Sequence, residues 1–273
     1  GKNTITVNDV TVAEWGTDKI EGGKAEVIPY VTFTAEAEQK FKMTTSGNYT
    51  ISGLQYSVKN GEWQDVVNEN PVTFGGANGP LRLRGKNVYG TASSASNYSN
   101  ITFTDADVKV ACTGDIRTLL DWRNYNIVET YHARFCSLFK NCNVLTSAPE
   151  LPATTLAGFC YQYMFYGCTS LTDAPELKAT ELAISCYASM FRGCTKLSTV
   201  TMLAPSDKIL KPSKCCYNWL YNAGTDGTVK SRTLKVQDEA AYNALIGISF
   251  LPDMWKKGFM DTTVLNKDNT EIK

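Results

Sequence analysis

The stretch that decides the fold is FKNCNVLTSAPEL, residues 139–151, because the chain repeats it. Displaced by 26 residues, it reads FYGCTSLTDAPEL at 165–177, and a third copy with the same offset reads FRGCTKLSTVTML at 191–203. A fourth, degenerate copy around Cys215 and Trp219 follows a three-residue insertion. An internal repeat of this length is a stronger indication of architecture than the local propensity of any segment.

A period of 26 residues lies within the 20–29 range of leucine-rich repeats, in which each unit is one short strand and a helical or 3₁₀ return. A single unit cannot bury its own apolar face, so the recurring Leu, Phe and Cys residues are expected to stack into one continuous core. Pro149 and Pro175 recur in register and each removes a hydrogen-bond donor, which predicts a short and imperfect sheet. The expected returns are Tyr161–Phe165 and Tyr187–Phe191, and the expected strands of one parallel sheet are Leu145–Leu151, Leu171–Leu177 and Leu197–Leu203.

The first 112 residues are strand-like and lack the repeat. Short runs of alternating apolar and polar residues are separated by turns, which is typical of a sandwich. The clearest hairpin is LQYSVKNGEWQDV at 54–66. In this run we expect Asn60-Gly61 to supply the two positive-φ positions of a type I′ turn and to pair Val58 with Trp63.

The end of the chain is expected to close the repeat region. Leu234 and Val236 are predicted to form a last strand, and Asp238 to cap a helix whose acidic first turn suits the positive end of the helix. The predicted fold class is α+β or mixed. Its parts are an N-terminal antiparallel β-sandwich-like domain over 1–112, a leucine-rich-repeat solenoid of about four coils over 113–227, and a C-terminal capping segment over 228–273.

Two runs within the repeat resemble a known family. APELPATTLA at 148–157 and CYQYMFYGCTSLT at 160–172 are similar to the BspA-like leucine-rich repeat surface proteins of Bacteroidetes. The upstream hairpin and a short helix from Asp115 also resemble what precedes such repeats in these proteins. The resemblance implies an exported protein, often grouped with adhesins, that is extracellular or anchored at the cell surface or outer membrane. Because Gly1 begins the chain and no apolar leader follows, we expect any signal peptide to have been removed.

Composition narrows the classes of function. Lys and Arg total 27 and Asp and Glu total 27, so the formal net charge is zero, and neither nucleic acid nor an anionic membrane is expected as a partner. No apolar run reaches the roughly 18–20 residues that span a bilayer. His132 is the single histidine, which weighs against most hydrolases and metalloenzymes. We expect a monomer with no cofactor, no metal and no catalytic residues.

Nine cysteines in a protein expected to be exported leave two interpretations open. One column begins at Cys142 and another at Cys160, and coils about 4.8 Å apart would bring their members within disulfide range. We favour small buried thiols, because three thiols in a column leave one unpaired and the total is odd. A zinc site would lack paired CxxC spacing. A nucleophile made from Cys136 and His132 would lack an orienting Asn or Asp, and we expect His132 to be exposed.

Positions that vary between copies are the candidates for exposure and binding. Along the strands they are rich in hydroxyls and nearly uncharged, which suits weak polar contacts with a sugar or a protein loop. On the returns, the rings of Tyr163 and Tyr166 could stack on a sugar, as could Trp15 or Trp63 in the β domain. The other variable return positions are Ser137, Lys140, Ser189 and Arg192. The strand candidates are Thr146, Ser147, Thr172, Asp173, Ser198, Thr199 and Thr201.

These observations favour a non-enzymatic, exported surface protein whose leucine-rich-repeat face binds an unidentified protein or glycan. Two alternatives stay open. One is a structural or spacer protein of the cell envelope, and the other is a carbohydrate-binding component of a glycan-uptake system in which the β domain binds. An enzyme would be indicated if Glu150 and Glu176, one coil apart, converged in a deep cleft as a glycosidase pair does. Their place in a packing repeat favours a structural ladder instead.

Overall fold

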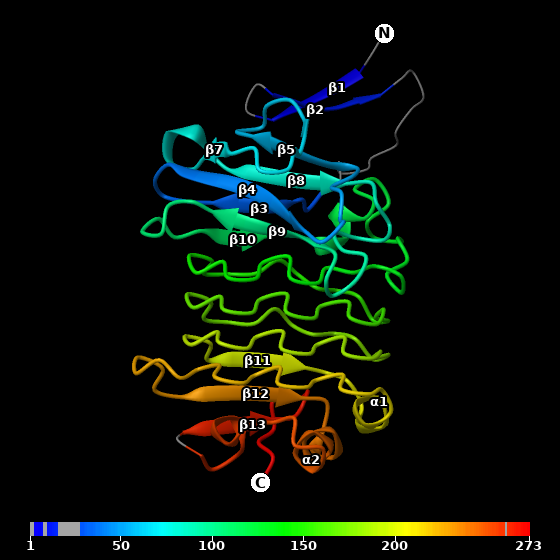
Figure 1. The fold of residues 1–273 in the computed structure, drawn as a ribbon, viewed down its shortest axis with the longest axis vertical. Helices are drawn as coiled ribbons and strands as arrows, with labels where there is room; N and C mark the ends of the chain where they lie inside the picture. The colour runs from blue at the N-terminus through cyan, green and yellow to red at the C-terminus, as the bar shows by residue number, and fades with distance from the viewer. Residues whose placement is uncertain (1–2, 8–9, 16–27, 260) are drawn as a thin grey trace.

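The computed structural model describes residues 3–7, 10–15, 28–259 and 261–273. The fold is mixed and consists mostly of sheets with few helices, which confirms the predicted class at that level. Figure 1 shows the sheets of the N-terminal part at one end, stacked coils in the middle, and a last sheet with short helices at the other end. In the part of the chain that the structure describes, no helix combines the length and the hydropathy that a membrane crossing requires.

Two antiparallel sheets form the N-terminal sandwich. Their inner faces carry alternating buried residues such as Phe33 and Phe41, whose ring centroids lie 6.2 Å apart. Successive side chains of a strand point to opposite faces, so the same strands carry polar residues outside. The five-stranded sheet has the order β10 (Ala111–Thr113), β3 (Val31–Thr34), β8 (Leu81–Gly85), β5 (Leu54–Val58) and β6 (Gln64–Asp65). The three-stranded sheet has the order β7 (Val72–Phe74), β4 (Gln39–Ser46) and β9 (Tyr98–Phe103).

The hairpin between β5 and β6 is present, but its turn is displaced by one residue from the predicted place. The positive-φ residues are Lys59 and Asn60, at 51° and 59°, rather than Asn60 and Gly61. The predicted pairing of Val58 with Trp63 is therefore wrong by one position. Asparagine tolerates the left-handed conformation, which allows Asn60 to take the second turn position. The remaining N-terminal elements are the hairpin of β1 (Asn3–Val7) and β2 (Val10–Trp15) and the 3₁₀ turn η1 (Gly76–Asn78).

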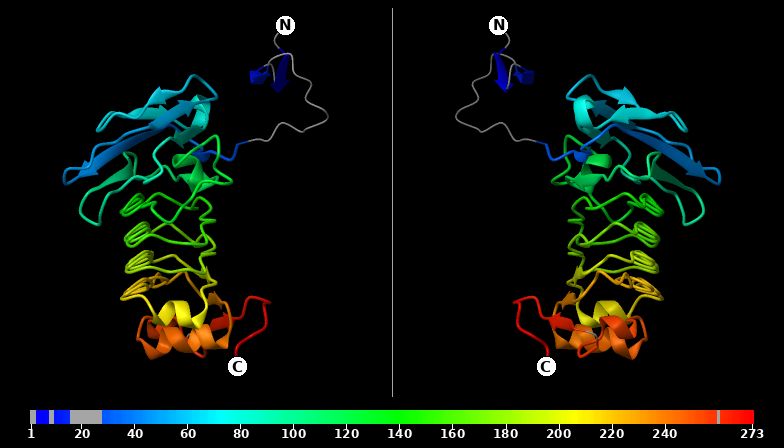
Figure 2. Two further views of the ribbon diagram at one scale, coloured as in Figure 1. Left: turned by 90° about the vertical axis from the view of Figure 1, so that its right-hand side faces the viewer. Right: turned by 90° about the vertical axis from the view of Figure 1, so that its left-hand side faces the viewer.

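Residues 134–223 form stacked coils held together by a repeated backbone pattern (Figure 2). Within a coil, alternate amides close tight turns, as Gln162 N does by donating to Phe159 O at 3.2 Å. The intervening amides donate to the next coil, as Tyr161 N does to Cys186 O at 2.9 Å. Both sets of backbone donors are satisfied, and half of the turn amides join one coil to the next.

The helical returns predicted at Tyr161–Phe165 and Tyr187–Phe191 are wrong. Consecutive turns replace them, and every fourth residue has a positive φ, as Phe159, Tyr163 and Gly167 do at 62°, 56° and 72°. An α-helix bonds each amide to a carbonyl four residues back in the same segment. Such a helix would leave no amides to join neighbouring coils, so the alternating turns give the stack its continuity.

The parallel sheet predicted for the coils is mostly reduced to isolated bridges. Asp173 bridges to Thr199 and Leu177 to Met202, and of the three predicted strands the third alone contains a regular one, β11 (Thr199–Met202). The expectation of a short, imperfect sheet is confirmed. Proline has no N–H to donate, which interrupts pairing in the first two copies, whereas threonine fills the corresponding position in β11.

Regular parallel pairing resumes beyond the coils. β11 pairs with β12 (Arg232–Val236), and β12 pairs with β13 (Thr262–Leu265). β12 contains Leu234 and Val236 as predicted, but it is not the last strand, because β13 follows it. The capping segment thus contributes two strands to the sheet instead of one.

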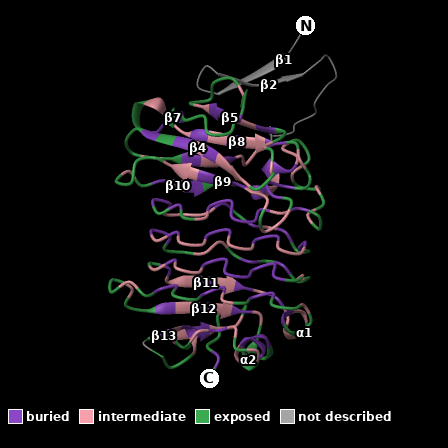
Figure 3. Cartoon of the chain, viewed as in Figure 1, coloured by how far each residue is buried: buried purple, intermediate pink, exposed green. Residues whose placement is uncertain are grey.

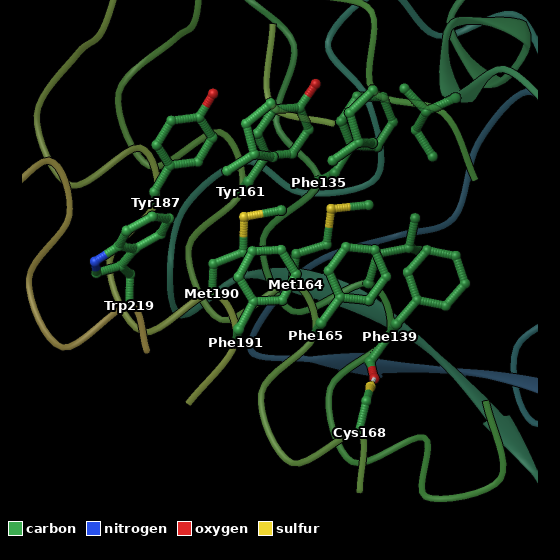
Figure 4. Close-up of a cluster of buried hydrophobic side chains, with 14 of the residues drawn as sticks. Phe135, Phe139, Tyr161, Met164, Phe165, Cys168, Tyr187, Met190, Phe191 and Trp219 are labelled. Carbon is green, nitrogen blue, oxygen red and sulfur yellow. Dashed lines mark hydrogen bonds between the residues drawn. The ribbon is translucent and has the colours of Figure 1, made fainter. Parts of the chain in front are cut away.

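The core of the coils consists of columns of like residues (Figure 4). Phe139, Phe165 and Phe191 stack with ring centroids 5.2 and 5.6 Å apart and interplanar angles of 6° and 3°. Buried residues continue from the sandwich through the coils into the C-terminal part (Figure 3). The expectation that recurring residues form one continuous core is confirmed. A second stacked column consists of Phe135, Tyr161 and Tyr187.

The nine cysteines are buried, free thiols, which agrees with the interpretation that the sequence favoured. Cys168 Sγ donates to Phe139 O and Cys194 Sγ to Phe165 O, both at 3.0 Å. Each bond runs from one coil to the preceding coil. The thiol fits the position because it is small, largely apolar and still a weak donor.

The sandwich covers the N-terminal end of the coil stack. The side-chain amide of Asn100, on β9, donates to Ser137 O at 2.8 Å and to Lys140 O at 3.0 Å. Ile101 N donates to Leu138 O at 2.7 Å. The bonds to Leu138 O and Lys140 O satisfy carbonyls that would otherwise face no neighbouring coil, whereas Ser137 O also accepts from Lys140 N within its own turn. The sandwich therefore takes the place of a preceding repeat.

Short helical elements flank the coils. η2 (Ile116–Leu119) begins at Asp115, whose side chain accepts from the amide of Arg117, and it matches the short helix that the resemblance implies. α2 (Glu239–Gly247) is capped by Asp238 as predicted, with Ala241 N donating to its carboxylate at 2.8 Å. The others are α1 (Ser206–Leu210) and η3 (Asp253–Trp255).

Candidate functional site

The coils carry a surface row of alternating cations and aromatic rings, which we call the cation–aromatic ladder. It consists of Tyr98, Lys140, Tyr166, Arg192 and Tyr221. Lys140 Nζ lies 5.9 Å from the ring centroid of Tyr98 and 5.8 Å from that of Tyr166. Arg192 Cζ lies 5.8 Å from the ring centroid of Tyr166 and 4.9 Å from that of Tyr221. Each cation therefore lies between two rings, within the range of cation–π attraction.

The ladder follows from the repeat. Lys140, Tyr166 and Arg192 occupy the same position of successive coils, 26 residues apart, and Tyr221 occupies it again after the insertion. Each of them directly follows a buried apolar residue of the core. The same turn geometry that points the buried residue inward therefore leaves the next side chain partly or largely exposed.

The structure brings together the predicted binding residues Tyr163 and Tyr166. Their ring centroids lie 6.0 Å apart in an edge-to-face arrangement, and both rings are partly exposed. Lys140 Nζ lies 5.7 Å from the ring centroid of Tyr163 as well. Two tyrosines of one coil and a lysine of the coil before it thus form a single surface cluster.

The predicted exposure of Ser137 and Ser189 is wrong. Both are buried, with exposed fractions of 0% and 4%. Each lies at a positive-φ corner of its turn, at 58° and 53°, and the stack covers that corner. The corner does not require a small side chain, because Tyr163 occupies the corresponding position of the intervening coil at a φ of 56° and is partly exposed.

The predicted strand residues lie along another edge of the coils, where several of their hydroxyls bond carbonyls of the preceding segment. Thr146 Oγ1 donates to Val110 O at 3.1 Å, and Ser198 Oγ donates to Thr172 O at 3.2 Å. These bonds hold consecutive segments together and leave few hydroxyls to bind a ligand. The remaining residues of this set, all half-buried or exposed, are Ser147, Thr172, Asp173, Thr199 and Thr201.

Glu150 and Glu176 line one surface hollow of about 250 Å³, together with Pro149 and Pro175. Both carboxylates are exposed, and Glu176 pairs with Lys178 at 3.3 Å. A carboxyl group that acts as a general acid needs a raised pKa, which burial away from water provides. The geometry that would indicate a glycosidase pair is a deep, dry cleft, and this hollow is open to water.

Cys136 and His132 lie in different environments. Burial raises the pKa of Cys136 to about 12, and its Sγ donates to Phe159 O at 2.6 Å. A thiol in this state stays protonated at neutral pH and is a poor nucleophile. His132 is exposed as expected, and its ring lies 4.2 Å from that of Tyr131.

Of the two tryptophans considered for sugar stacking, the structure describes the side chain of Trp63 alone. The side chain of Trp15 lies outside the described residues. Trp63 is half-buried, and Arg84 Cζ lies 4.2 Å from its ring centroid. Across the described ranges, no group of three or more His, Cys, Asp and Glu side chains is arranged to hold a metal ion.

No family model matches the chain, and no curated protein or solved structure matches it either. The resemblance to BspA-like proteins therefore stands as a hypothesis supported by the quoted motifs. Sequence reasoning left Tyr98 and Tyr221 out of the candidate site. Continuing the repeat across the insertion would have placed Tyr221 in the ladder. Tyr98 lies on a strand outside the repeat, so no periodic signal points to it.

Proposed function

We propose that this chain is a non-enzymatic, exported cell-surface protein whose coils form a leucine-rich-repeat solenoid that binds a protein or glycan through the cation–aromatic ladder. The observation that carries the proposal is the ladder itself. It places Lys140, Tyr166, Arg192 and Tyr221 in one partly exposed row across consecutive coils. The 26-residue period and the coil-to-coil hydrogen bonds support the solenoid assignment. The exported location rests on the family resemblance alone.

The chemistry of the ladder suits recognition. Tyrosine and arginine are over-represented among the residues that dominate binding energy, because each combines a large apolar area with polar groups. Cation–π contacts hold Lys140 and Arg192 between rings, which reduces the entropy lost when a partner binds. A partner with ring or C–H faces beside hydroxyl or acidic groups would fit this row.

A structural or spacer role is the second candidate, and the strand edge favours it. Hydroxyls such as those of Thr146 and Ser198 bond neighbouring segments instead of facing solvent freely. If the ladder binds nothing, the coils would serve to hold the sandwich and the C-terminal segment a fixed distance apart.

The proposal is tested by screening the whole chain on an array of host and dietary glycans and matrix glycoproteins. The test variant combines Lys140→Gln, Tyr166→Ala and Arg192→Gln, and Tyr89→Ala serves as the control because Tyr89 is 61% exposed and lies outside the ladder. We expect a saturable hit that weakens at least tenfold in the triple variant and not in the control. A blank array, or a hit that the triple variant retains, would contradict binding by the ladder and favour the spacer role.

A further inference from the structure

A second cluster of cations and aromatic rings lies on the sandwich, separate from the ladder in composition and position. We call it the arginine–tryptophan cluster, and it consists of Tyr30, Trp63, Arg82, Arg84, Trp122 and Arg123. Arg84 Cζ lies between two indoles, 4.2 Å from the ring centroid of Trp63 and 4.3 Å from that of Trp122. Arg82 Cζ lies 5.3 Å from the ring of Trp63, and Arg123 Cζ lies 4.8 Å from that of Trp122.

The fold places these residues on the outer face of the five-stranded sheet. Arg82 and Arg84 alternate with buried leucines along β8, so both point away from the sandwich core. Gly85 ends the strand, and a Cβ atom there would lie 1.9 Å from Leu119 O. Glycine at this position therefore allows η2 to cross closely over β8, with Trp122 N donating to Gly85 O at 3.2 Å. The close crossing brings Trp122 beside Arg84.

Within the part of the chain that the structure describes, the guanidinium groups of this cluster have no carboxylate counter-charge. Among the described residues, the ion pairs include no carboxylate partner for Arg82, Arg84 or Arg123. Arg84 Nε and Nη2 donate to the neutral Gln55 Oε1 at 3.0 and 2.8 Å. Arg82 Nη2 donates to Ser57 Oγ at 3.2 Å, and its buried Nε has no acceptor.

Holding these like charges together costs free energy that a bound anion would offset. Burial lowers the pKa of Arg82 and of Arg84, the neighbouring Tyr30 side chain partly opposes this effect, and repulsion from a neighbouring arginine lowers each pKa further. The indoles and Gln55 fix the guanidinium of Arg84 before any ligand arrives, so little side-chain entropy remains to be lost on binding. Clusters of this kind, strained by their own charge, are typical of binding sites.

We propose that the arginine–tryptophan cluster binds the acidic groups of a polysaccharide, namely carboxylate or sulfate groups on its sugars. Guanidinium groups bind such oxyanions through paired N–H donors. The half-buried indoles of Trp63 and Trp122 leave apolar surface beside the charges, which suits the C–H face of a sugar ring. An acidic peptide such as poly-glutamate carries carboxylates but has no sugar ring to pack against the indoles, so it fits the cluster less well. This site lies in the sandwich and does not depend on the ladder binding anything.

The test measures binding of the whole chain to polygalacturonate and to dextran sulfate by titration calorimetry, with neutral dextran as the reference polymer. The variants are Arg84→Gln and Arg123→Gln. The control is Lys40→Gln, which removes an exposed cation from β4 in the other sheet. We expect at least one acidic polymer to bind, at least tenfold more weakly in both arginine variants and equally in the control. Binding should weaken as salt is raised, and the preferred polymer identifies the anion.

Arg123 is exposed, so Arg123→Gln keeps the test meaningful if Arg84→Gln lowers the melting temperature. Three results would overturn the proposal. The first is no binding to either acidic polymer, and the second is equal binding by Arg123→Gln and the unmodified chain. The third is binding to poly-glutamate or single-stranded DNA as tight as binding to the acidic polysaccharides. None of these measurements uses a ladder variant such as Tyr166→Ala. A negative result would therefore overturn this proposal and leave the ladder proposal to be tested on its own.

Discussion

The sandwich and the coil stack achieve burial in different ways. In the sandwich, strands pair over long sequence separations, as β4 does with β9, and buried residues alternate along each strand. In the coils, half of the turn amides bond the next unit, and buried residues recur with the period of the repeat. A sheet of the sandwich is completed by its own strands, whereas a coil is completed by a neighbour. The stack therefore depends on the sandwich at one end and the C-terminal segment at the other.

Of the changes considered, alkaline pH is expected to produce the largest difference in stability between the sandwich and the coils. Burial raises the pKa of Cys136 and Cys186 to about 12, and it also raises the pKa of Cys142, Cys160, Cys168 and Cys194 above the ordinary value. Cys215 is the exception, because a hydrogen bond with Cys216 lowers its pKa. The sandwich has one such thiol, Cys112, and Tyr49, whose pKa burial raises to about 12. A raised folded-state pKa contributes stability that is complete below the unfolded-state pKa, near 9 for a thiol. That stability is lost as pH rises toward the folded-state pKa.

Each thiol whose pKa is raised should therefore contribute about 1.4 kcal/mol less to the stability of the coils at pH 10, and the coils should lose several kcal/mol together. Urea unfolding followed by circular dichroism from pH 7 to pH 10, with hydrogen exchange to locate the change, measures this difference. We expect the coils to unfold at much lower urea at pH 10 while the sandwich changes less. Coils as stable at pH 10 as at pH 7 would contradict the assignment of buried, protonated thiols.

Removing one ring from the central column should be the next largest effect. Phe165 is fully buried between two stacked phenylalanines, so Phe165→Ala is expected to cost about 3–5 kcal/mol of unfolding free energy. Tyr166→Ala, at the adjacent and partly exposed position, should cost about 1 kcal/mol or less. Urea denaturation of both variants makes the comparison. Equal losses would mean that the columns do not dominate the stability of the coils.

The junction between the two regions can be weakened at a single residue. Asn100→Ala removes the side-chain amide that bonds Ser137 O and Lys140 O, which should cost about 1–3 kcal/mol. We expect the unfolding transitions of sandwich and coils, followed by separate probes, to move apart. Asn143→Ala, at an exposed asparagine of the first coil, is the control. Coincident and unshifted transitions in Asn100→Ala would show that this bond does not couple the regions.

The smallest effect is expected at the positive-φ corners of the coils. Gly193 has a φ of 75°, and a Cβ atom there would meet its nearest neighbour at 3.7 Å, so the site has room for a side chain. Asparagine already fills the corresponding corners at Asn141 and Asn222. Gly193→Asn should therefore change stability by about 0.5 kcal/mol or less, and Gly193→Ala should cost about 1 kcal/mol. Thermal melting of Gly193→Asn and Gly193→Ala measures the difference. Equal losses of stability would show that the positive φ at this corner does not favour asparagine over alanine.

The repeat predicted more of the fold than the local sequence did. The core columns and the interrupted sheet at Pro149 and Pro175 follow from the repeat, whereas local sequence predicted the cap at Asp238. The alternating turns follow from neither, because helix and consecutive turns bury the same apolar positions of a short segment. A helix and consecutive turns differ in which carbonyls accept from the backbone amides, and the pattern of apolar residues does not indicate those acceptors.

The sequence predicted only part of the candidate site, because variation between copies marks exposed positions but does not show which of them are free to bind a ligand. Tyr163 and Tyr166 were found because they vary between copies, and their rings do lie together. The hydroxyls of the strand residues also vary, yet several hold neighbouring segments together, since a short polar side chain can bond a nearby backbone as readily as a ligand. The arginine–tryptophan cluster joins residues of four distant segments, so no local pattern announces it.

We propose that recognition belongs to the ladder and not to the strand edge. The most direct measurement is the dissociation constant of the strongest array hit for the unmodified chain, for Tyr166→Ala and for Asp173→Ala, since Asp173 is an exposed strand-edge residue. We predict at least tenfold weaker binding for Tyr166→Ala and unchanged binding for Asp173→Ala. Weaker binding for Asp173→Ala together with unchanged binding for Tyr166→Ala would contradict it.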